Sequence, residues 1–201
     1  MVLKKISEQD KIVSVWSGGT TSQLYISPEN ASFSDRIFEF RISSAVVELE
    51  ESDFTPMPGF SRILMVLEGE LEIIHEGYYS KVLKQFEIDE FSGDWKTSSK
   101  GKVVDFNLIM GDGICGSMKY ISLGKEENLF KIDSGGDRSR PVRTLGYYLI
   151  SGKIQINLNQ EEYELEKGEM ILIEMEMNFA FDKIEVNGFG NLIQLMIWKE
   201  V

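Results

Sequence analysis

Short apolar segments, each bounded by turn-forming residues, recur along the whole chain. They return about every eight to twelve residues, and several alternate apolar with polar positions, as half-buried strands do. No segment sustains the period of an amphipathic helix, so the pattern predicts an all-β chain folded as a sandwich or barrel. The strands are expected at residues 11–16, 24–26, 38–46, 63–67, 71–75, 80–83, 86–95, 101–110, 118–123, 145–150, 154–158, 162–165, 170–175 and 192–198.

The stretch from Ser52 to Gly69 carries the strongest local signals. Two prolines and a glycine within four positions predict a tight, stiff loop, because proline presets φ and glycine tolerates positive φ. An apolar strand at 63–67, a turn at Gly69 and a return strand at 71–75 then predict a β-hairpin. Arg62 lies where the loop enters the first of these strands.

The same pattern returns in the C-terminal part, where an arginine, an apolar strand, a glycine turn and an alternating strand follow one another. Aligning Gly69 with Gly152 pairs Leu71 with Ile154, Ile73 with Ile156, Val82 with Leu165 and Ile88 with Ile171. This shared register indicates an internal duplication of a small double-sheet β-barrel. The expected domains are an N-terminal barrel over 1–123, a polar linker over 124–142 and a partial C-terminal barrel over 143–201.

Composition narrows the expected partners. The 201 residues carry a formal net charge of −12, and because an acidic chain repels phosphate backbones, nucleic acid is not an expected partner. No apolar run reaches the length of a membrane span or a signal peptide, so no membrane partner is expected and the cytoplasm is the expected location. The single cysteine, Cys115, excludes an internal disulfide and is interpreted as a small apolar filler.

A single histidine, His75, limits the metal chemistry of the chain. Metal sites in double-sheet barrels usually combine two or three histidines with a carboxylate, which one chain with one histidine cannot supply. No metal and no cofactor are therefore expected. An all-oxygen site for a hard cation is the alternative that this argument leaves open, and the sequence carries no signature of one. Because His75 alternates with Leu71 and Ile73, we expect it on their apolar face as a packed core residue.

A glycine-bearing loop follows the first expected strand. It contains Gly18, Gly19, Thr20 and Thr21, and the backbone N–H groups of such a loop can approach a ligand closely. An ordinary glycine turn has the same composition, and the spacing matches neither a dinucleotide fingerprint nor a Walker loop.

Two strands place polar side chains in pairs on one face. Arg41 and Ser43 alternate with aromatic and aliphatic residues in the strand at 38–46. If their face lines a barrel, Arg41 would bind an anion through its planar guanidinium, and if it faces solvent, Arg41 is a surface cation. Asp105 and Asn107 also share a face, where they would contact a ligand or cap a neighbouring loop.

Four motifs occur in order along the first part of the chain. They are Trp16 with Gly18–Thr21, then Phe40–Ser43, then Phe54 with Pro58, Gly59, Arg62 and Gly69, and finally Asp105–Asn107. Together they resemble the HutD/Ves family over roughly residues 10–123. That family usually has an asparagine in its glycine loop, which is shortened here, and a glutamate where this chain has Gln23. The resemblance implies a bicupin, that is, two tandem cupin-like double-stranded β-helix (jelly-roll) barrels. It also implies a sensing or regulatory role linked to histidine catabolism or stress, without an established catalytic activity.

The first functional hypothesis is a non-metal protein that binds a small anionic ligand, a carboxylate such as a product of histidine breakdown. Its expected ligand-binding residues are Trp16, Gly18, Gly19, Thr20, Thr21, Gln23, Arg41, Ser43, Arg62, Asp105 and Asn107. Barrel mouths with a few convergent polar groups among apolar walls are common ligand sites. A structural alternative for two of these residues is a pair between Arg62 and Asp105 that braces the hairpin.

Two other hypotheses remain open from the sequence. A metal-independent enzyme, isomerase-like or epimerase-like, would use His75 or a carboxylate such as Asp105 or Glu68 as its base, with Arg41 stabilising an oxyanion. An interaction protein would form a homodimer through a sheet edge, for which the last apolar strand, 192–198, is the candidate.

Overall fold

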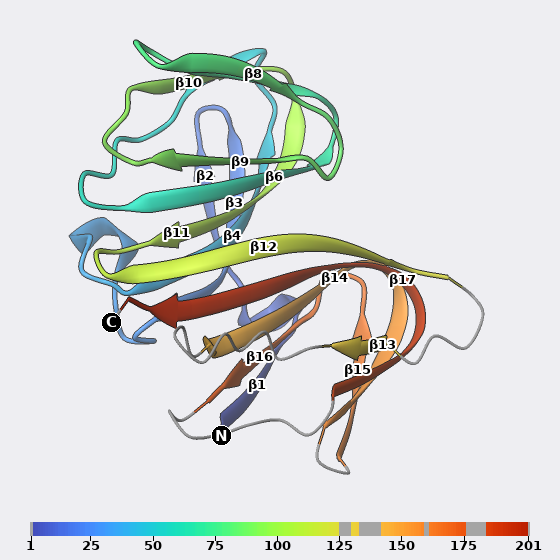
Figure 1. The fold of residues 1–201 in the computed structure, drawn as a ribbon. Helices are drawn as coiled ribbons and strands as arrows, with labels where there is room; N and C mark the ends of the chain where they lie inside the picture. The colour runs from blue at the N-terminus through green and yellow to red at the C-terminus, as the bar shows by residue number, and fades with distance from the viewer. Residues whose placement is uncertain (1, 125–129, 133–141, 159–160, 176–183, 201) are drawn as a thin grey trace. The chain divides into compact units, whose positions relative to one another are not determined.

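The computed structural model describes residues 2–124, 130–132, 142–158, 161–175 and 184–200, which are mostly β-strand, as the alternating pattern predicts (Figure 1). Its helices are two short 3-10 turns, so no helix among these residues is long and apolar enough to cross a membrane. The elements are β1 (Val2–Ile6), η1 (Glu8–Asp10), β2 (Ile12–Trp16), β3 (Gly19–Ser27), η2 (Phe33–Asp35), β4 (Phe40–Val47), β5 (Glu51–Asp53), β6 (Ser61–Glu68), β7 (Leu71–His75), β8 (Tyr79–Leu83), β9 (Ile88–Ser92), β10 (Thr97–Lys100), β11 (Val103–Met110), β12 (Ile114–Leu123), β13 (Phe130–Ile132), β14 (Val142–Leu158), β15 (Glu161–Glu166), β16 (Met170–Glu174) and β17 (Ile184–Lys199).

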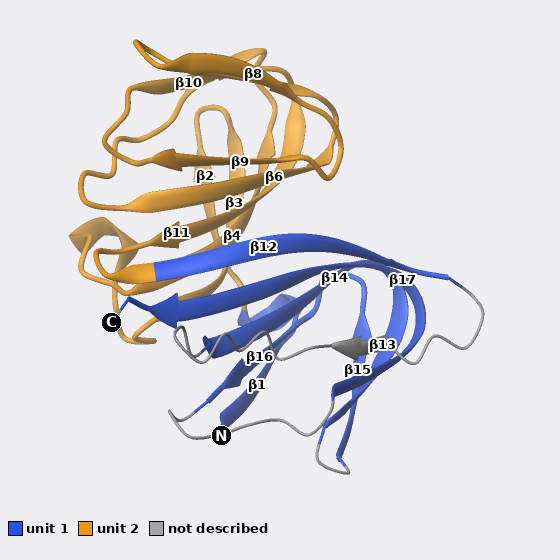
Figure 2. Cartoon of the chain, viewed as in Figure 1, with its two compact units in different colours: residues 1–10, 115–201 blue, residues 11–114 orange. Residues whose placement is uncertain are grey.

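The chain divides into two compact units, residues 11–114 and residues 1–10 with 115–201 (Figure 2). These units differ from the predicted domains. Strand β1 pairs with β16, and β12 lies beside β17 in the same sheet, so the first ten residues and most of β12 belong with the C-terminal unit. Most of the predicted linker lies outside the described residues, and its described part, β13, pairs with β17.

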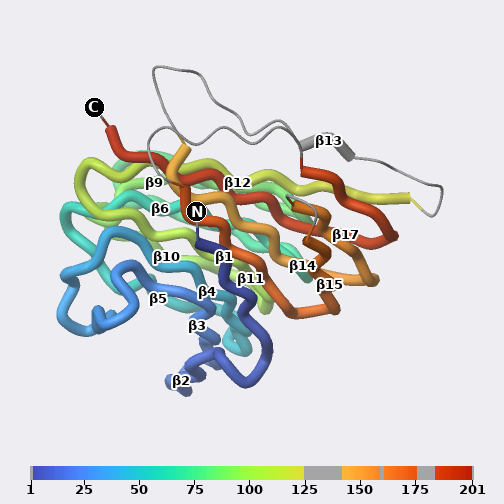
Figure 3. Tube along the Cα trace, turned by 90° about the horizontal axis from the view of Figure 1, so that it is seen from below, coloured from blue at the N-terminus to red at the C-terminus, as the bar shows by residue number. Residues whose placement is uncertain are grey.

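The unit of residues 11–114 contains two antiparallel sheets. One has the strand order β2-β3-β4-β11-β6-β9 and the other β5-β10-β7-β8, and Figure 3 shows β2 and β9 at opposite borders of the larger sheet. Apolar residues from both sheets form one core: Val47, Leu64, Val66, Leu71, Ile73, Leu83, Phe91 and Val103. This is the double-sheet arrangement that the strand pattern predicts.

The second unit is built on two long strands. β14 and β17 pair from Val142 opposite Trp198 to Leu158 opposite Ile184, with β16 and β1 beyond β14, and β12 beyond β17. One core cluster includes residues from both halves of β14, such as Tyr147 and Ile156. Because β17 is paired on both sides, the predicted strand at 192–198 is not a free sheet edge.

The predicted hairpin between residues 63–67 and 71–75 is wrong, although both strands exist. β6 pairs with β11 and β9, whereas β7 pairs with β10 and β8 in the other sheet. Gly69 has a φ of 89°, and a Cβ there would lie 2.6 Å from the carbonyl oxygen of Lys102. The glycine therefore permits a close passage of the chain from one sheet to the other.

Gly152 also does not make the predicted turn. It lies within the continuous strand β14, opposite Gly190 of β17, at a φ of 93° and close to a register shift between Leu149 and Ser151. A bulge and a pair of glycines bend a strand without ending it. The glycine that predicted a turn therefore marks a bend within a continuous strand.

The predicted alignment of the two halves is correct for the strand that begins at Leu71. It is wrong by one residue in the strand that follows. Leu71 and Ile154 are both buried, and their cross-strand partners are Leu83 and Leu165. Leu83 is thus the counterpart of Leu165, whereas the predicted counterpart, Val82, is 50% exposed. A one-residue slip exchanges the faces of a strand, so the alignment by glycines was wrong beyond the first strand.

Candidate functional site

The unit of residues 11–114 contains a cavity of about 330 Å³. Strands β2, β3, β4, β5, β6 and β11, the η2 turn and the loop after β5 line it with Ser14, Trp16, Thr21, Phe33, Arg41, Ser43, Ala45, Val47, Ser52, Asp53, Phe54, Thr55, Met57, Arg62, Asp105, Asn107 and Ile109. Its volume lies at the small end of the range for ligand pockets, and a few polar groups among apolar walls is their usual composition.

Two arginines reach this cavity from strands on either side of β11. Arg41 of β4 and Arg62 of β6 are both register partners of Ile109. Directly opposed residues of neighbouring strands share a face, so the three side chains form a row across the sheet. Two strand spacings separate the arginine Cβ atoms by about 10 Å.

Arg41 is held by short polar contacts and by an aromatic ring. Its Nε donates a hydrogen bond to Gln23 Oε1 at 2.7 Å, and its Nη1 donates to Ser43 Oγ at 3.1 Å. The guanidinium lies 4.1 Å from the ring centroid of Phe33, a cation–π distance. Burial lowers the pKa of Arg41 to about 10. The face of β4 that carries Arg41 therefore lines a cavity and is not the solvent face.

Arg62 is also buried, and one of its donors has no acceptor. Its Nη2 donates to Asn107 Oδ1 at 3.1 Å, and its guanidinium lies 4.8 Å from the ring of Phe54 and 5.2 Å from that of Phe91. Its Nε is buried without a hydrogen-bond partner. Burial lowers the pKa of Arg62 to about 10, with Asp105 acting against that shift and the nearby Arg41 adding to it. An unmade hydrogen bond from a buried charged group is costly, so this N–H is the donor of Arg62 that lacks an acceptor beside the cavity.

Asp105 belongs to the same hydrogen-bonded cluster as Arg62 and Asn107. Asn107 Nδ2 donates to Asp105 Oδ1 at 2.5 Å, which links Arg62 to Asp105 through the amide of Asn107. Burial raises the pKa of Asp105 to about 7, against the opposing effects of Arg62, Asn107 and the backbone N–H of Ala45. The carboxyl is therefore poised to exchange a proton near neutral pH.

Seven of the eleven predicted site residues line the cavity: Trp16, Thr21, Arg41, Ser43, Arg62, Asp105 and Asn107. Gln23 does not line it but holds Arg41 in place. The sequence prediction missed Phe33 as a ring partner of Arg41. Only the fold brings the short η2 turn over β4, so no local signal pointed to it.

Of the predicted glycine loop, only Thr21 lines the cavity. Gly18, Gly19 and Thr20 do not line the cavity and belong to the β2–β3 hairpin. A Cβ on Gly18 would lie 2.1 Å from the Trp16 ring, and one on Gly19 would lie 1.9 Å from the Val46 carbonyl oxygen. Gly18 therefore makes room for the Trp16 ring, and Gly19 for the close approach of the β4 backbone. Trp16 is 37% exposed at the cavity and donates from Nε1 to Thr21 Oγ1 at 3.2 Å.

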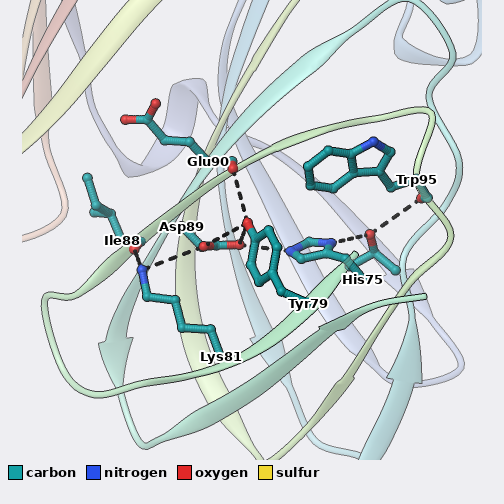
Figure 4. Close-up of polar contacts among 8 residues, drawn as sticks. His75, Tyr79, Lys81, Ile88, Asp89, Glu90 and Trp95 are labelled. Carbon is teal, nitrogen blue, oxygen red and sulfur yellow. Dashed lines mark hydrogen bonds and ion pairs between the residues drawn. The ribbon is translucent and has the colours of Figure 1, made fainter. Parts of the chain in front are cut away.

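His75 is buried as predicted, but in a polar network that the sequence did not reveal (Figure 4). Its Nδ1 lies 2.8 Å from Thr97 Oγ1 and its Nε2 lies 2.8 Å from Asp89 Oδ2. Tyr79 donates its hydroxyl hydrogen to Asp89, and Lys81 lies 3.6 Å from the other carboxylate oxygen. His75 does not line the cavity and both of its ring nitrogens are engaged, so the geometry gives it no access to a ligand there.

No three histidine, cysteine or acidic side chains converge as a metal-binding group within the part of the chain that the structure describes. The charged side chains that line the cavity are Arg41, Arg62, Asp105 and, at an exposed position, Asp53. The site thus has the chemistry of an anion pocket with one adjustable carboxyl group.

Solved structures of low sequence identity share the fold. HutD from Pseudomonas fluorescens, determined in a formate condition, aligns over 100% of both chains with a TM-score of 0.74 and 17% identity. A conserved protein of unknown function from Pseudomonas aeruginosa aligns over 100% of both chains with a TM-score of 0.76 and 19% identity. YhhW from Escherichia coli, described as a bacterial pirin in complex with nickel(II), reaches 0.66 at 11% identity over 100% of both chains.

The sequence itself shows the family. No curated protein matches the chain. The sequence model of the HutD family, however, matches residues 8–188, which include the whole unit of residues 11–114, with every residue of the cavity, and most of the other unit. The matched region extends well beyond the N-terminal motifs that first suggested the resemblance, and the chain is therefore a member of the HutD family.

Proposed function

We propose that this protein binds a small carboxylate in the cavity between Arg41 and Arg62. The buried Arg62 Nε, which has no acceptor, is the observation that carries the proposal. A carboxylate oxygen would satisfy that donor, and guanidinium groups bind carboxylates more strongly than neutral donors do.

The surroundings of the two arginines favour an anion that is held in place. Phe33 and Phe54 lie over the guanidinium groups, while Gln23 and Ser43 fix the orientation of Arg41. A guanidinium with a fixed orientation loses less conformational freedom when it binds, which increases affinity without additional contacts.

A sensing or regulatory role is the part of the proposal that depends on the family. Members of the HutD family are associated with histidine catabolism, so intermediates of that pathway are the natural ligands to examine. Formate is the first probe, because the P. fluorescens structure was determined in a formate condition.

A thermal-shift titration tests the proposal. Formate, formylglutamate and urocanate would be added to the wild-type chain, to Arg41→Ala and to Arg41→Lys, which keeps the charge but not the planar fork. Saturation at about a hundred times the dissociation constant stabilises a protein by about 2.7 kcal/mol, which appears as a rise in Tm of several degrees.

We expect the rise in wild type and its loss in both Arg41 variants. Arg143→Ala, which removes an exposed arginine of the other unit, serves as the matched control and should respond like wild type. Equal shifts in Arg41→Ala and wild type would place the carboxylate elsewhere and refute the proposal.

A second candidate function rests on the carboxyl group of Asp105. A general base works best with a pKa near the working pH, and the pKa of Asp105 is about 7 beside a cavity that contains two cations. Asp105 would then remove a proton from a bound carboxylate while Arg41 or Arg62 stabilises the enolate. Exchange of substrate C–H for deuterium in D₂O, absent in Asp105→Asn, is the result that this candidate requires.

A further inference from the structure

The charges that face the cavity do not balance. Arg41 on β4 and Arg62 on β6 supply two positive charges, and Asp105 on β11 between them supplies one negative charge when ionised. The other groups packed around Asp105 are the neutral Asn107 on its own strand and the backbone of Ala45. Asp53 lies at an exposed position, where solvent screens its charge. The buried groups therefore carry one excess positive charge.

A ligand with one carboxylate cancels this excess and requires no change of protonation. A ligand with two carboxylates leaves one uncompensated negative charge if Asp105 remains ionised. Burying an unpaired charge is strongly unfavourable, so such a ligand would be rejected unless one buried group changed its charge. Asp105 can do so, because a proton from solvent converts it to a neutral carboxyl group that still hydrogen-bonds.

The row of side chains across the sheet suits two-point binding. Arg41 and Arg62 flank Ile109 with Cβ atoms about 10 Å apart, and both side chains line the same cavity. Arg41 uses Nε and Nη1 within the protein, whereas Arg62 uses Nη2 and leaves Nε without an acceptor. Each arginine thus has at least one nitrogen that does not bond to Gln23, Ser43 or Asn107. One arginine could therefore bind each end of a short dicarboxylate.

We propose that this cavity binds a short dicarboxylate together with one proton, which Asp105 takes up from solvent, whereas it binds a monocarboxylate without proton uptake. The inference rests on the proposed carboxylate site and adds the charge of its ligand. The only bond formed is the O–H bond of Asp105, and no electrons are transferred. Cellular pH would then select between dianionic and monoanionic ligands, because the proton is needed for only one of them.

Fumarate and crotonate are a matched pair of probes for this idea. Crotonate has the shape of fumarate with a methyl group in place of one carboxylate, so the two differ mainly in charge. Isothermal titration calorimetry at about pH 8, repeated in two buffers of different ionisation enthalpy, counts the protons taken up. We expect about one proton with fumarate and about none with crotonate.

The pH dependence and a variant give independent readouts. With one proton bound by a group of pKa about 7, the affinity for fumarate falls about tenfold between pH 6 and pH 8, while that for crotonate does not fall. Asp105→Asn should bind fumarate about tenfold more tightly than wild type at pH 8, with no proton uptake. Asp112→Asn, which changes an exposed aspartate, should behave as wild type.

The outcomes separate the two proposals. Fumarate binding without proton uptake would overturn the proton-linked dicarboxylate while leaving the carboxylate site in place. Crotonate binding with no fumarate binding, even at pH 6 and in Asp105→Asn, would also overturn it. If neither these probes nor formate bind, and Arg41→Ala changes nothing, the carboxylate site itself fails and the dicarboxylate proposal with it.

Discussion

The free energy of unfolding should depend on pH through Asp105 in a direction opposite to that of most aspartates. Burial raises the pKa of Asp105 from 3.8 to about 7 in the folded protein. The folded state therefore holds the proton more tightly than the unfolded state does. The stabilising contribution is fully present below pH 3.8 and is lost as the pH rises through about 7.

The magnitude follows from the size of the shift. From 3.8 to about 7, at about 1.36 kcal/mol per pKa unit, the whole effect is about 4 kcal/mol. Asp105 is 3% exposed, so solvent screening removes little of this value. About 2 kcal/mol of it falls between pH 5 and pH 7, where most other carboxyl groups have finished titrating.

Asp105→Asn removes the titration and keeps an oxygen that accepts from Asn107. Urea unfolding of wild type and variant at pH 5 and pH 7, followed by tryptophan fluorescence, gives the difference in unfolding free energy at each pH. We expect the variant to gain about 2 kcal/mol relative to wild type over this interval. Trp16 and Trp95 both report on the unit that contains Asp105.

Asp112→Asn is the control, since its carboxyl group is exposed and its unfolding free energy should follow that of wild type at both pH values. A difference between Asp105→Asn and wild type that stays constant from pH 5 to pH 7 would show that Asp105 ionises normally in the folded protein. The argument from burial would then be refuted.

Two further predictions concern the free energy of unfolding. His75→Ala should lower the free energy of unfolding by urea by about 3–5 kcal/mol, because it leaves the buried Asp89 without its imidazole partner. The double variant His75→Leu with Asp89→Leu should lose less than the sum of the two single changes. Additive losses would show that the pair does not interact. Leu83→Ala should cost about 2–5 kcal/mol and Val82→Ala less than about 0.5 kcal/mol in the same assay, because only Leu83 is buried; the reverse order would restore the register predicted from the glycine alignment.

Local sequence patterns predicted where the strands lie more reliably than they predicted which strands pair. The apolar runs around Ile63 and Leu71 are strands, but they belong to different sheets, because a glycine with positive φ can turn a chain into a hairpin, a crossing between sheets or a bend. Gly69 makes the crossing and Gly152 the bend. The residue type at such a position says that the backbone departs from ordinary φ values, and the neighbouring strands decide in which direction.

The site was predictable to the extent that it follows strand alternation. Arg41 with Ser43, and Asp105 with Asn107, were correctly placed in pairs on one face, because side chains two apart in a strand point the same way. Gly18 and Gly19 do not line the cavity; Gly18 leaves space for the Trp16 ring and Gly19 for the Val46 carbonyl, and space for a ligand would require the same residue type.

The sequence by itself determined the all-β class, the family and which side chains share a strand face, because each depends on residues close together along the chain. It left open whether the face of Arg41 meets solvent or a cavity, and it gave no sign that Asp89 would meet His75. Only the tertiary structure decided these points. Burial, the pairing of distant strands and the pKa of Asp105 arise from residues that the fold brings together across the sheets.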